Sequence, residues 1–174
     1  MTLAGRLIAS AAAIAAGLAA FQSASAQTPA APAAAAPAPR YVSIPLEIHV
    51  DKDAPTVWKK LSGYCDIGTW MKVPCVYTSG DGGLGTNRLI AGRVNEILVA
   101  KTSTSYTYAQ PLAPNSYHGT VEVVPDGAGA KILYTLFYDV APAGDAKAQA
   151  DDVARRAKLF TGVLAKMKAI AEAP

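Results

Sequence analysis

The stretch GDAKAQADDVARRAKLFTGVLAKMKAIAEAP, residues 144–174, decides the fold that this sequence predicts. Its apolar side chains recur at alternating spacings of four and three, which is typical of an amphipathic helix with one buried face. Charged side chains occupy the other face, and Asp145 near the start suits the helix dipole. We therefore predict one long helix that other elements must cover. Its buried face consists of Val153, Ala157, Phe160, Leu164, Met167 and Ala171, widened by Val163 and Ile170.

The residues before this helix predict a sheet that could cover it. Residues 42–50 alternate between apolar and other side chains, which predicts a half-buried strand, and Pro45 favours an edge position. Asp53, Ala54 and Pro55 predict the start of a short helix to about Ser62, and a second helical turn follows at 66–71. Six β-rich runs then alternate with turn residues, at 76–79, 85–91, 94–102, 105–110, 116–124 and 131–140. This order predicts an α+β domain with a curved antiparallel sheet of about seven strands wrapped round the C-terminal helix.

The N-terminal residues predict an export signal. Arg6 precedes an alanine-rich apolar run at 7–20, and Ala24, Ser25 and Ala26 match the small-residue pattern of signal peptidase cleavage. The apolar run of about 14 residues falls short of the roughly 20 that a membrane span needs. We therefore expect no stable membrane span, cleavage near Ala26, and a periplasmic or secreted protein.

The rest of the chain divides into a tether and one domain. Residues 27–40 are mostly alanine and proline, a composition typical of a semi-rigid extended linker. Residues 41–174 are enough for a single domain with its own core. The net charge of +3 falls by one, to +2, when Arg6 is removed with the signal. Because this charge is weak and scattered, we expect no nucleic-acid partner, and no pattern identifies a protein partner.

A series of short motifs between residues 44 and 172 carries a family resemblance. They are His49-Val50-Asp51 through Val57-Trp58, Gly85-Thr86-Asn87-Arg88, Asn95-Glu96-Ile97-Leu98, Tyr106-Thr107-Tyr108, Pro111-Leu112, Tyr117-His118-Gly119-Thr120, Val123-Val124-Pro125 and the final helix. Their order and spacing resemble the START-like, or SRPBCC, helix-grip superfamily and its polyketide cyclase/dehydrase-like branch. The resemblance implies a ligand cavity between the sheet and the C-terminal helix. It implies little about chemistry, because the superfamily includes binders, carriers, receptors and enzymes.

Strand alternation predicts which polar side chains face this cavity. If residues 91–93 form a three-residue loop, position 88 lies opposite position 96, and Arg88 and Glu96 become cross-strand partners. A two-residue loop would turn one of them to solvent. Because neither charge is tolerable alone in an apolar cavity, burial would require the pair. Two interpretations stay open: the pair contacts the polar end of a ligand, or it is purely structural.

Further cavity candidates come from the helices and the tyrosine-rich strands. The resemblance places Tyr64 and Trp70 at the cavity mouth, whereas Trp58 is expected in the core; core packing is the alternative for both tryptophans. A cavity of this kind encloses about 300 to 1,000 Å³, so we expect a small hydrophobic or amphipathic ligand. Arg88 would favour a carboxylate or hydroxyl terminus. The candidate ligand-binding residues are Tyr64, Trp70, Arg88, Glu96, Tyr106, Tyr108, Tyr117, Phe160, Val163, Leu164 and Met167.

No catalytic or cofactor motif is found in the sequence. Strand alternation turns His49 and His118 away from the apolar face, and the glycine-rich residues 80–85 lack the lysine of a phosphate loop. These glycines predict a hairpin turn, with a mobile lid as the alternative. We expect no metal or cofactor, and we favour ligand binding without catalysis. The alternatives are a polyketide cyclase or dehydratase that uses the same cavity, and an interaction module on the tether.

Cys65 and Cys75 are the only two cysteines of the chain. An exported protein meets an oxidising compartment, which favours a disulfide over two buried thiols. Such a bridge would close a loop of about ten residues and stabilise the fold by roughly 3 kcal/mol. It would also hold Trp70, which lies between the two cysteines, in place.

Overall fold

The computed structural model describes residues 38–174. Within them the elements follow the predicted order, and the α+β helix-grip fold is confirmed. The predicted signal peptide, its cleavage site and most of the 27–40 linker lie outside the described residues. The elements are β1 (Tyr41–Val50), α1 (Ala54–Leu61), α2 (Ile67–Met71), β2 (Cys75–Ser79), β3 (Asn87–Ile90), β4 (Val94–Lys101), β5 (Ser105–Ala109), β6 (His118–Asp126), β7 (Gly129–Asp139), the 3-10 helix η1 (Ala141–Ala143) and α3 (Ala146–Glu172).

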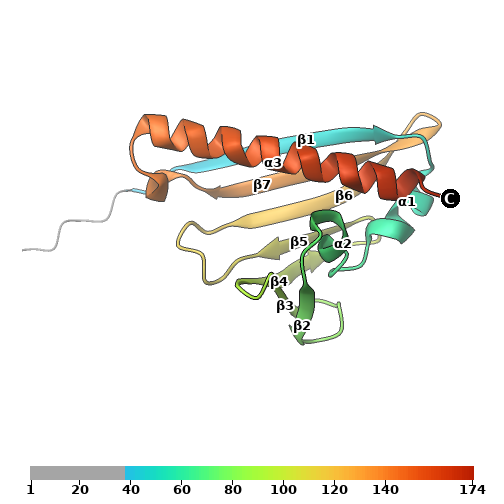
Figure 1. The fold of residues 1–174 in the computed structure, drawn as a ribbon, viewed down its shortest axis with the longest axis horizontal. Coiled ribbons are helices and arrows are strands. Elements are labelled where there is room, and N and C mark those ends of the chain that lie inside the picture. The colour runs from blue at the N-terminus through green and yellow to red at the C-terminus, as the bar shows by residue number, and fades with distance from the viewer. Residues whose placement is uncertain (1–37) are drawn as a thin grey trace, which may run out of the picture. The chain divides into compact units, whose positions relative to one another are not determined.

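The seven strands form one antiparallel sheet in the order β1-β7-β6-β5-β4-β3-β2. The sheet curves, and α3 lies across it above β1 and β7 (Figure 1). β1 is an edge strand, as Pro45 predicts. Proline has no backbone N–H to donate to a neighbouring strand, so it is tolerated at the edge of a sheet, where one side of the strand has no partner. The glycine-rich residues 80–85 join β2 to β3 at the opposite edge, in the predicted hairpin.

The buried face of α3 packs on the sheet along its C-terminal half. Asp145 begins the helix, because its Oδ1 accepts a hydrogen bond of 2.8 Å from the backbone N–H of Ala148. The predicted stripe is confirmed, although Val153, Ala157 and Ile170 are only half-buried. Its fully buried members are Phe160, Val163, Leu164, Met167 and Ala171.

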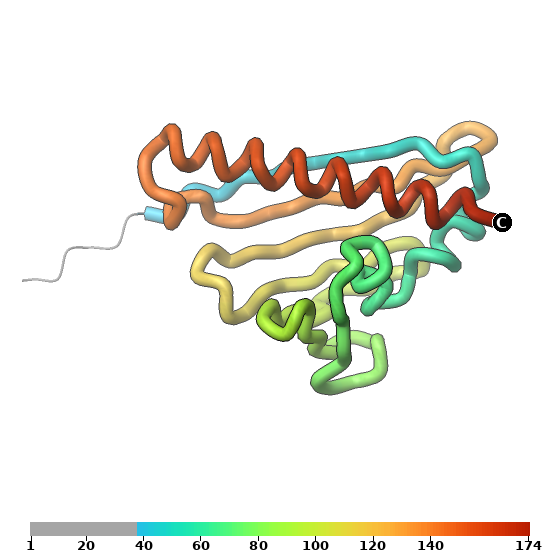
Figure 2. Tube along the Cα trace, viewed as in Figure 1, coloured from blue at the N-terminus to red at the C-terminus, as the bar shows by residue number. Residues whose placement is uncertain are grey.

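The two short helices lie on the same side of the sheet as α3. Figure 2 follows the chain from β1 through α1 and α2 before it enters β2. Both α1 and α2 contact α3, and α1 also contacts β6 and β7. Trp58 of α1 is half-buried with its ring 6.0 Å from the ring of Tyr106, so it packs against the core rather than inside it, where it was expected. The short helices therefore close the space that the sheet and α3 leave open.

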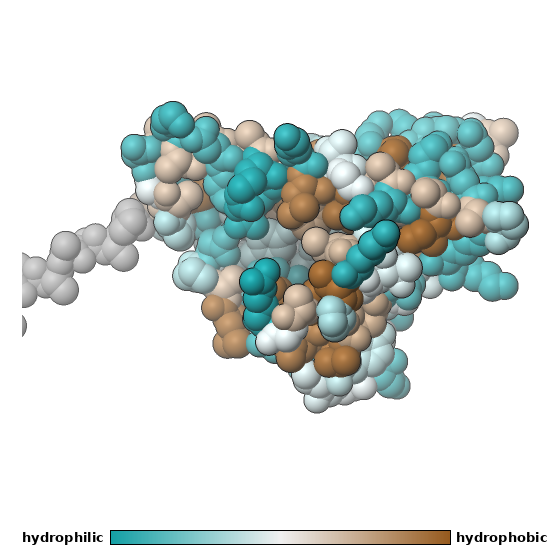
Figure 3. Space-filling model, in the orientation of Figure 1, coloured by the Kyte–Doolittle hydropathy of each residue, from teal (hydrophilic) through white to brown (hydrophobic). Residues whose placement is uncertain are grey.

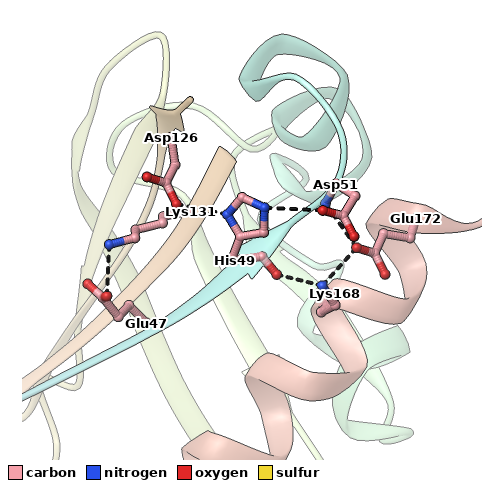
Figure 4. Close-up of polar contacts among 7 residues, drawn as sticks. All are labelled: Glu47, His49, Asp51, Asp126, Lys131, Lys168 and Glu172. Carbon is pink, nitrogen blue, oxygen red and sulfur yellow. Dashed lines mark hydrogen bonds and ion pairs between the residues drawn. The ribbon is translucent and has the colours of Figure 1, made fainter. Parts of the chain in front are cut away.

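A polar network ties the C-terminal end of α3 to β1 (Figure 4). The Nζ of Lys168 donates to the carbonyl oxygen of His49 at 2.7 Å and pairs with Glu172 at 2.9 Å. Glu172 in turn accepts from the backbone N–H of Asp51 at 3.0 Å. The exposed ring of His49 lies between Asp51, at 3.2 Å, and Asp126, at 2.8 Å. His49 therefore points away from the core, as the strand alternation predicts.

Candidate functional site

The β3–β4 hairpin brings the predicted charge pair together. Residues 91–93 form the three-residue loop, in which Ala91 and Gly92 adopt left-handed backbone angles of 51° and 68° in φ. Ile90 then pairs with Val94, and Arg88 with Glu96. The Nε and Nη2 of Arg88 donate to Oε2 of Glu96 at 2.8 and 2.5 Å. The predicted cross-strand pairing of these two residues is confirmed.

Every hydrogen-bonding nitrogen of Arg88 already has an acceptor. Its Nη1 donates to the carbonyl oxygen of Tyr64, and the guanidinium lies 3.9 Å from the centre of the Tyr64 ring. Arg88 is 0% exposed. Burial raises the pKa of Glu96, and the neighbouring Arg88 limits that rise; Gln110 donates to the other carboxylate oxygen of Glu96 at 2.9 Å. The pair is therefore satisfied within the protein, which favours a structural role for Arg88.

A cavity of about 160 Å³ lies between the sheet and the helices. It is smaller than the expected 300 to 1,000 Å³. That prediction is wrong because the tyrosine rings of β5 and β7, and that of Tyr117 just before β6, are buried in the same space. Trp70 is only 1% exposed, so it packs in the core and does not gate the mouth. The lining residues are Ile67 and Met71 of α2, Ile90, Val94, Glu96, Tyr108, Gln110 and Tyr117 of the sheet and its loops, and Arg156 and Phe160 of α3.

The sequence candidates therefore fall into two groups. Glu96, Tyr108, Tyr117 and Phe160 line the cavity. The others are buried in the core around it and do not line it. They are Tyr64, Trp70, Arg88, Tyr106, Val163, Leu164 and Met167. Strand and helix periodicity identifies the inward face correctly, but it does not separate side chains that reach the cavity from those that fill the core.

The phenols of Tyr64, Tyr106, Tyr108 and Tyr134 are buried in the core, and that of Tyr108 also lines the cavity. The hydroxyls of Tyr108 and Tyr134 are 2.8 Å apart and hydrogen-bonded, and burial raises the pKa of both well above the ordinary value. Within the described residues, the hydroxyls of Tyr64 and Tyr106 have no hydrogen-bond partner. All these phenols stay protonated at neutral pH, so they act as neutral hydrogen-bonding groups rather than as bases.

Two polar lining residues were missed by sequence reasoning. Gln110 continues the period-two series of Tyr106 and Tyr108, and Arg156 precedes Phe160 by one helical turn, so periodicity could have found both. The Nε of Arg156 donates to Asp152 at 2.8 Å. Its guanidinium lies 4.4 Å from the ring centre of Tyr138 and 5.2 Å from that of Tyr117. Although burial disfavours its charge, Asp152 raises the pKa of Arg156.

A disulfide between Cys65 and Cys75 holds α2 against β2, with the two Cα atoms 5.6 Å apart. Trp70 lies within the closed loop. Within residues 38–174, no group of three or more His, Cys, Asp or Glu side chains is arranged to hold a metal ion. In the same part of the chain, no helix is long and apolar enough to cross a membrane.

The chain is similar to one protein family and to several solved structures. The family model described as "Polyketide cyclase / dehydrase and lipid transport" matches residues 41–172. A search of curated proteins gave no match. A solved structure from Nitrosospira multiformis aligns with a TM-score of 0.61 at 18% identity, covering 74% of this chain and 94% of that chain. At such identities the likeness shows the fold alone.

Two further solved structures share the fold. The crystal structure of Ara h 8.0201 aligns with a TM-score of 0.56 at 14% identity, covering 76% of this chain and 98% of that chain. A solution structure from Thermobifida fusca aligns with a TM-score of 0.57 at 19% identity, covering 75% of this chain and 91% of that chain. The shared architecture therefore spans nearly the whole of each of these proteins.

Proposed function

This chain belongs to the polyketide cyclase/dehydrase and lipid transport family, and we propose that it binds a small hydrophobic or amphipathic ligand in the cavity between the sheet and α3. The observation that carries the proposal is the lining of that cavity. Apolar side chains from both layers form its walls, and only a few polar groups converge on it. This combination is typical of small-molecule sites. The apolar wall residues are Ile67, Met71, Ile90, Val94 and Phe160.

The polar end of the ligand would meet Gln110, Tyr117 and Arg156. Gln110 and Arg156 also line a second hollow of about 380 Å³ next to the cavity, so they stand at one end of it. Arg156 uses its Nε for Asp152 and no bond within the described residues involves its two Nη groups. In Arg88, by contrast, each of the three guanidinium nitrogens already donates a hydrogen bond within the protein. A carboxylate or hydroxyl terminus would therefore be recognised from α3 rather than from β3.

The cavity volume limits the size of the ligand. About 160 Å³ suits a single aromatic ring or a short chain. A longer acyl or isoprenoid molecule would have to extend past Gln110 and Arg156 into the neighbouring hollow. The ligand class we propose is therefore a small amphipathic molecule whose apolar part fills the cavity.

Native mass spectrometry after purification from a bacterial periplasm tests this proposal directly. We expect a bound small molecule that organic extraction releases and identifies. Val94→Phe, which fills the cavity, should abolish the bound mass. Val99→Phe is the matched control, because Val99 lies on the same strand but is 47% exposed. Loss of the ligand in both variants, or a ligand-free protein that also binds no member of an aromatic and short-chain amphiphile library, would overturn the proposal.

We also propose that the chain is exported and that residues 1–26 are its signal peptide. The sequence pattern before Ala26 supports this, and the Cys65–Cys75 disulfide suits an oxidising compartment. The domain at 41–174 would then stand on the alanine- and proline-rich tether. Intact mass measurement of protein from a periplasmic extract should give a chain that begins at Gln27. A full-length chain found only in the cytoplasm would contradict export.

A further inference from the structure

A groove lies on the outer side of α3, where the helix passes α2. It has a volume of about 480 Å³ and an apolar floor with a cationic rim. Leu159 is 47% exposed there, although it is a large apolar side chain. Figure 3 shows hydrophobic atoms gathered along α3 and beside α2, with hydrophilic groups around them. The lining residues are Met71, Arg155, Lys158, Leu159, Gly162, Val163 and Lys166.

Two of the three positive charges of this groove, those of Lys158 and Lys166, are not neutralised by the helix that carries them. Each acidic side chain of α3 already has a basic partner: Asp151 pairs with Lys147, Asp152 with Arg155 and Arg156, and Glu172 with Lys168. Lys158 and Lys166 have no ion-pair partner within the described residues, and no acidic residue lines the groove.

This distribution of charge is specific to one face. Elsewhere on α3 the basic side chains are matched by acids one helical turn away, which is the usual arrangement of a solvated helix surface. At the groove, unpaired ammonium groups instead flank an exposed leucine. A partner for this surface must therefore be anionic and must offer an apolar layer beneath its charges. The surface of a bilayer that contains anionic lipids has both properties.

We propose that this groove docks the protein on an anionic lipid bilayer. Lys158 and Lys166 contact lipid phosphates, and Leu159 inserts among the upper acyl carbons. Met71 lines both the groove and the ligand cavity, so the docked face adjoins the cavity through one flexible side chain. The docking rests on the charge and shape of the groove. The docked protein could also exchange its ligand with the bilayer, and this second step rests in addition on the proposed function.

Vesicle sedimentation tests the docking. The protein is expressed as the full chain, purified from the compartment it reaches, and mixed with vesicles of phosphatidylcholine alone or of phosphatidylcholine and phosphatidylglycerol in equal parts. We expect binding only to the second kind. It should weaken between about 0.1 M and about 1 M salt, because the Debye length falls from roughly 10 to 3 Å.

Two double variants that change the net charge by the same amount test which surface binds the vesicles. Lys158→Glu combined with Lys166→Glu should reduce the affinity for anionic vesicles at least about tenfold. Lys52→Glu combined with Lys59→Glu changes the net charge equally at residues that do not line the groove, and should leave the affinity within about threefold. Leu159→Ser should weaken binding with no change in charge. Circular dichroism and thermal unfolding verify that all variants fold.

The possible results separate the docking from the proposed function. Equal loss in both charge variants would overturn the groove as the docking surface. Absence of binding to anionic vesicles would overturn it as well. If light scattering then showed a dimer that Leu159→Ser dissociates, the groove would be a contact between two copies of the chain and the bilayer proposal would still be overturned. Neither result would affect a ligand found by native mass spectrometry. Anionic vesicle binding that only the groove variants impair would establish the docking even if no ligand were found.

Discussion

Arg88 and Arg156 approach the cavity from opposite layers, one from β3 and the other from α3. Arg88 is enclosed by Glu96, the Tyr64 carbonyl and two aromatic rings. Arg156 lines the cavity directly and also lies against two aromatic rings, but within residues 38–174 its side chain makes one hydrogen bond, to Asp152. The same residue type therefore serves stability in one position and is available to a ligand in the other. The difference comes from how many acceptors the fold provides around each guanidinium.

Arg88→Met and Arg156→Met should separate these two roles. We expect Arg88→Met to lower the free energy of unfolding by about 3 to 5 kcal/mol, because it leaves the Glu96 carboxylate buried without a partner. Adding Glu96→Leu should restore much of the loss. Arg156→Met should cost about 1 kcal/mol or less and should weaken a carboxylate ligand more than its neutral analogue. Urea denaturation and calorimetry measure both effects, and a reversed order would contradict the assignment.

The ring of His49 gives the end of β1 a pH-dependent attachment to Asp126, at the end of β6. The hydrogen bond to Asp126, and to a smaller extent that to Asp51, raises the pKa of His49 above the ordinary histidine value of about 6.5. A raised pKa in the folded state means that the protonated ring stabilises the fold. This contribution is complete below the pKa of the unfolded chain and is lost as the pH rises through the higher pKa of the folded protein.

Thermal unfolding between about pH 5.5 and pH 8 should detect this attachment. The wild-type Tm should fall relative to that of His49→Gln as the pH rises, with the change centred above pH 6.5. His118→Gln is the control, because among the described residues the ring of His118 has one hydrogen-bond partner, the carbonyl oxygen of Ser116. A constant difference between wild type and His49→Gln across the range would exclude a role for the protonated ring.

At the scale of the elements, α2 depends on its covalent link. It has five residues, and Lys72 ends it in a left-handed conformation. So short a helix is unstable on its own. The disulfide fixes it to β2, and its Ile67 and Met71 can therefore form part of the cavity wall.

Removing this link should affect stability and the cavity together. For Cys65→Ser combined with Cys75→Ser, we expect the free energy of unfolding to fall by about 2 to 4 kcal/mol, because the unfolded chain regains freedom. Ligand affinity should fall as well, since Ile67 and Met71 become less ordered. Denaturation of the wild type with and without reductant should show the same loss. If reduced and oxidised protein unfold at the same denaturant concentration, the bridge contributes nothing.

Sequence periodicity predicted the elements well and the cavity only partly. The α3 stripe and the edge position of β1 follow from local rules of spacing, so the sequence alone was sufficient for them. The Arg88–Glu96 register also depended on the length of the loop between β3 and β4, which the sequence left open between two and three residues. The volume of the cavity depends on how the rotamers of several tyrosines fill a shared space, which no local rule determines. The assignment of Arg88 to the ligand was made from residue type, and its acceptors became visible only in three dimensions.

At the scale of the whole molecule, the side chains between the sheet and α3 both form the core and enclose the cavity. Phe160 lies at the boundary, because it lines the cavity and its ring centre is 4.8 Å from that of Tyr134. The fold therefore balances packing against ligand space. Each side chain that fills the space between the sheet and α3 adds stability and reduces the room for a ligand.

Phe160→Ala should shift this balance towards ligand space. We expect the free energy of unfolding to fall by about 3 to 5 kcal/mol, as is usual for a buried phenylalanine. The enlarged cavity should accept longer ligands than the wild type, so that affinity along a homologous series of amphiphiles peaks at a greater chain length. Leu159→Ala on the exposed face of α3 is the control and should change stability by about 0.5 kcal/mol or less. Calorimetric titration with the series measures the shift. An unchanged optimum in Phe160→Ala would mean that the ligand does not reach this wall, and would place the binding site elsewhere on the molecule.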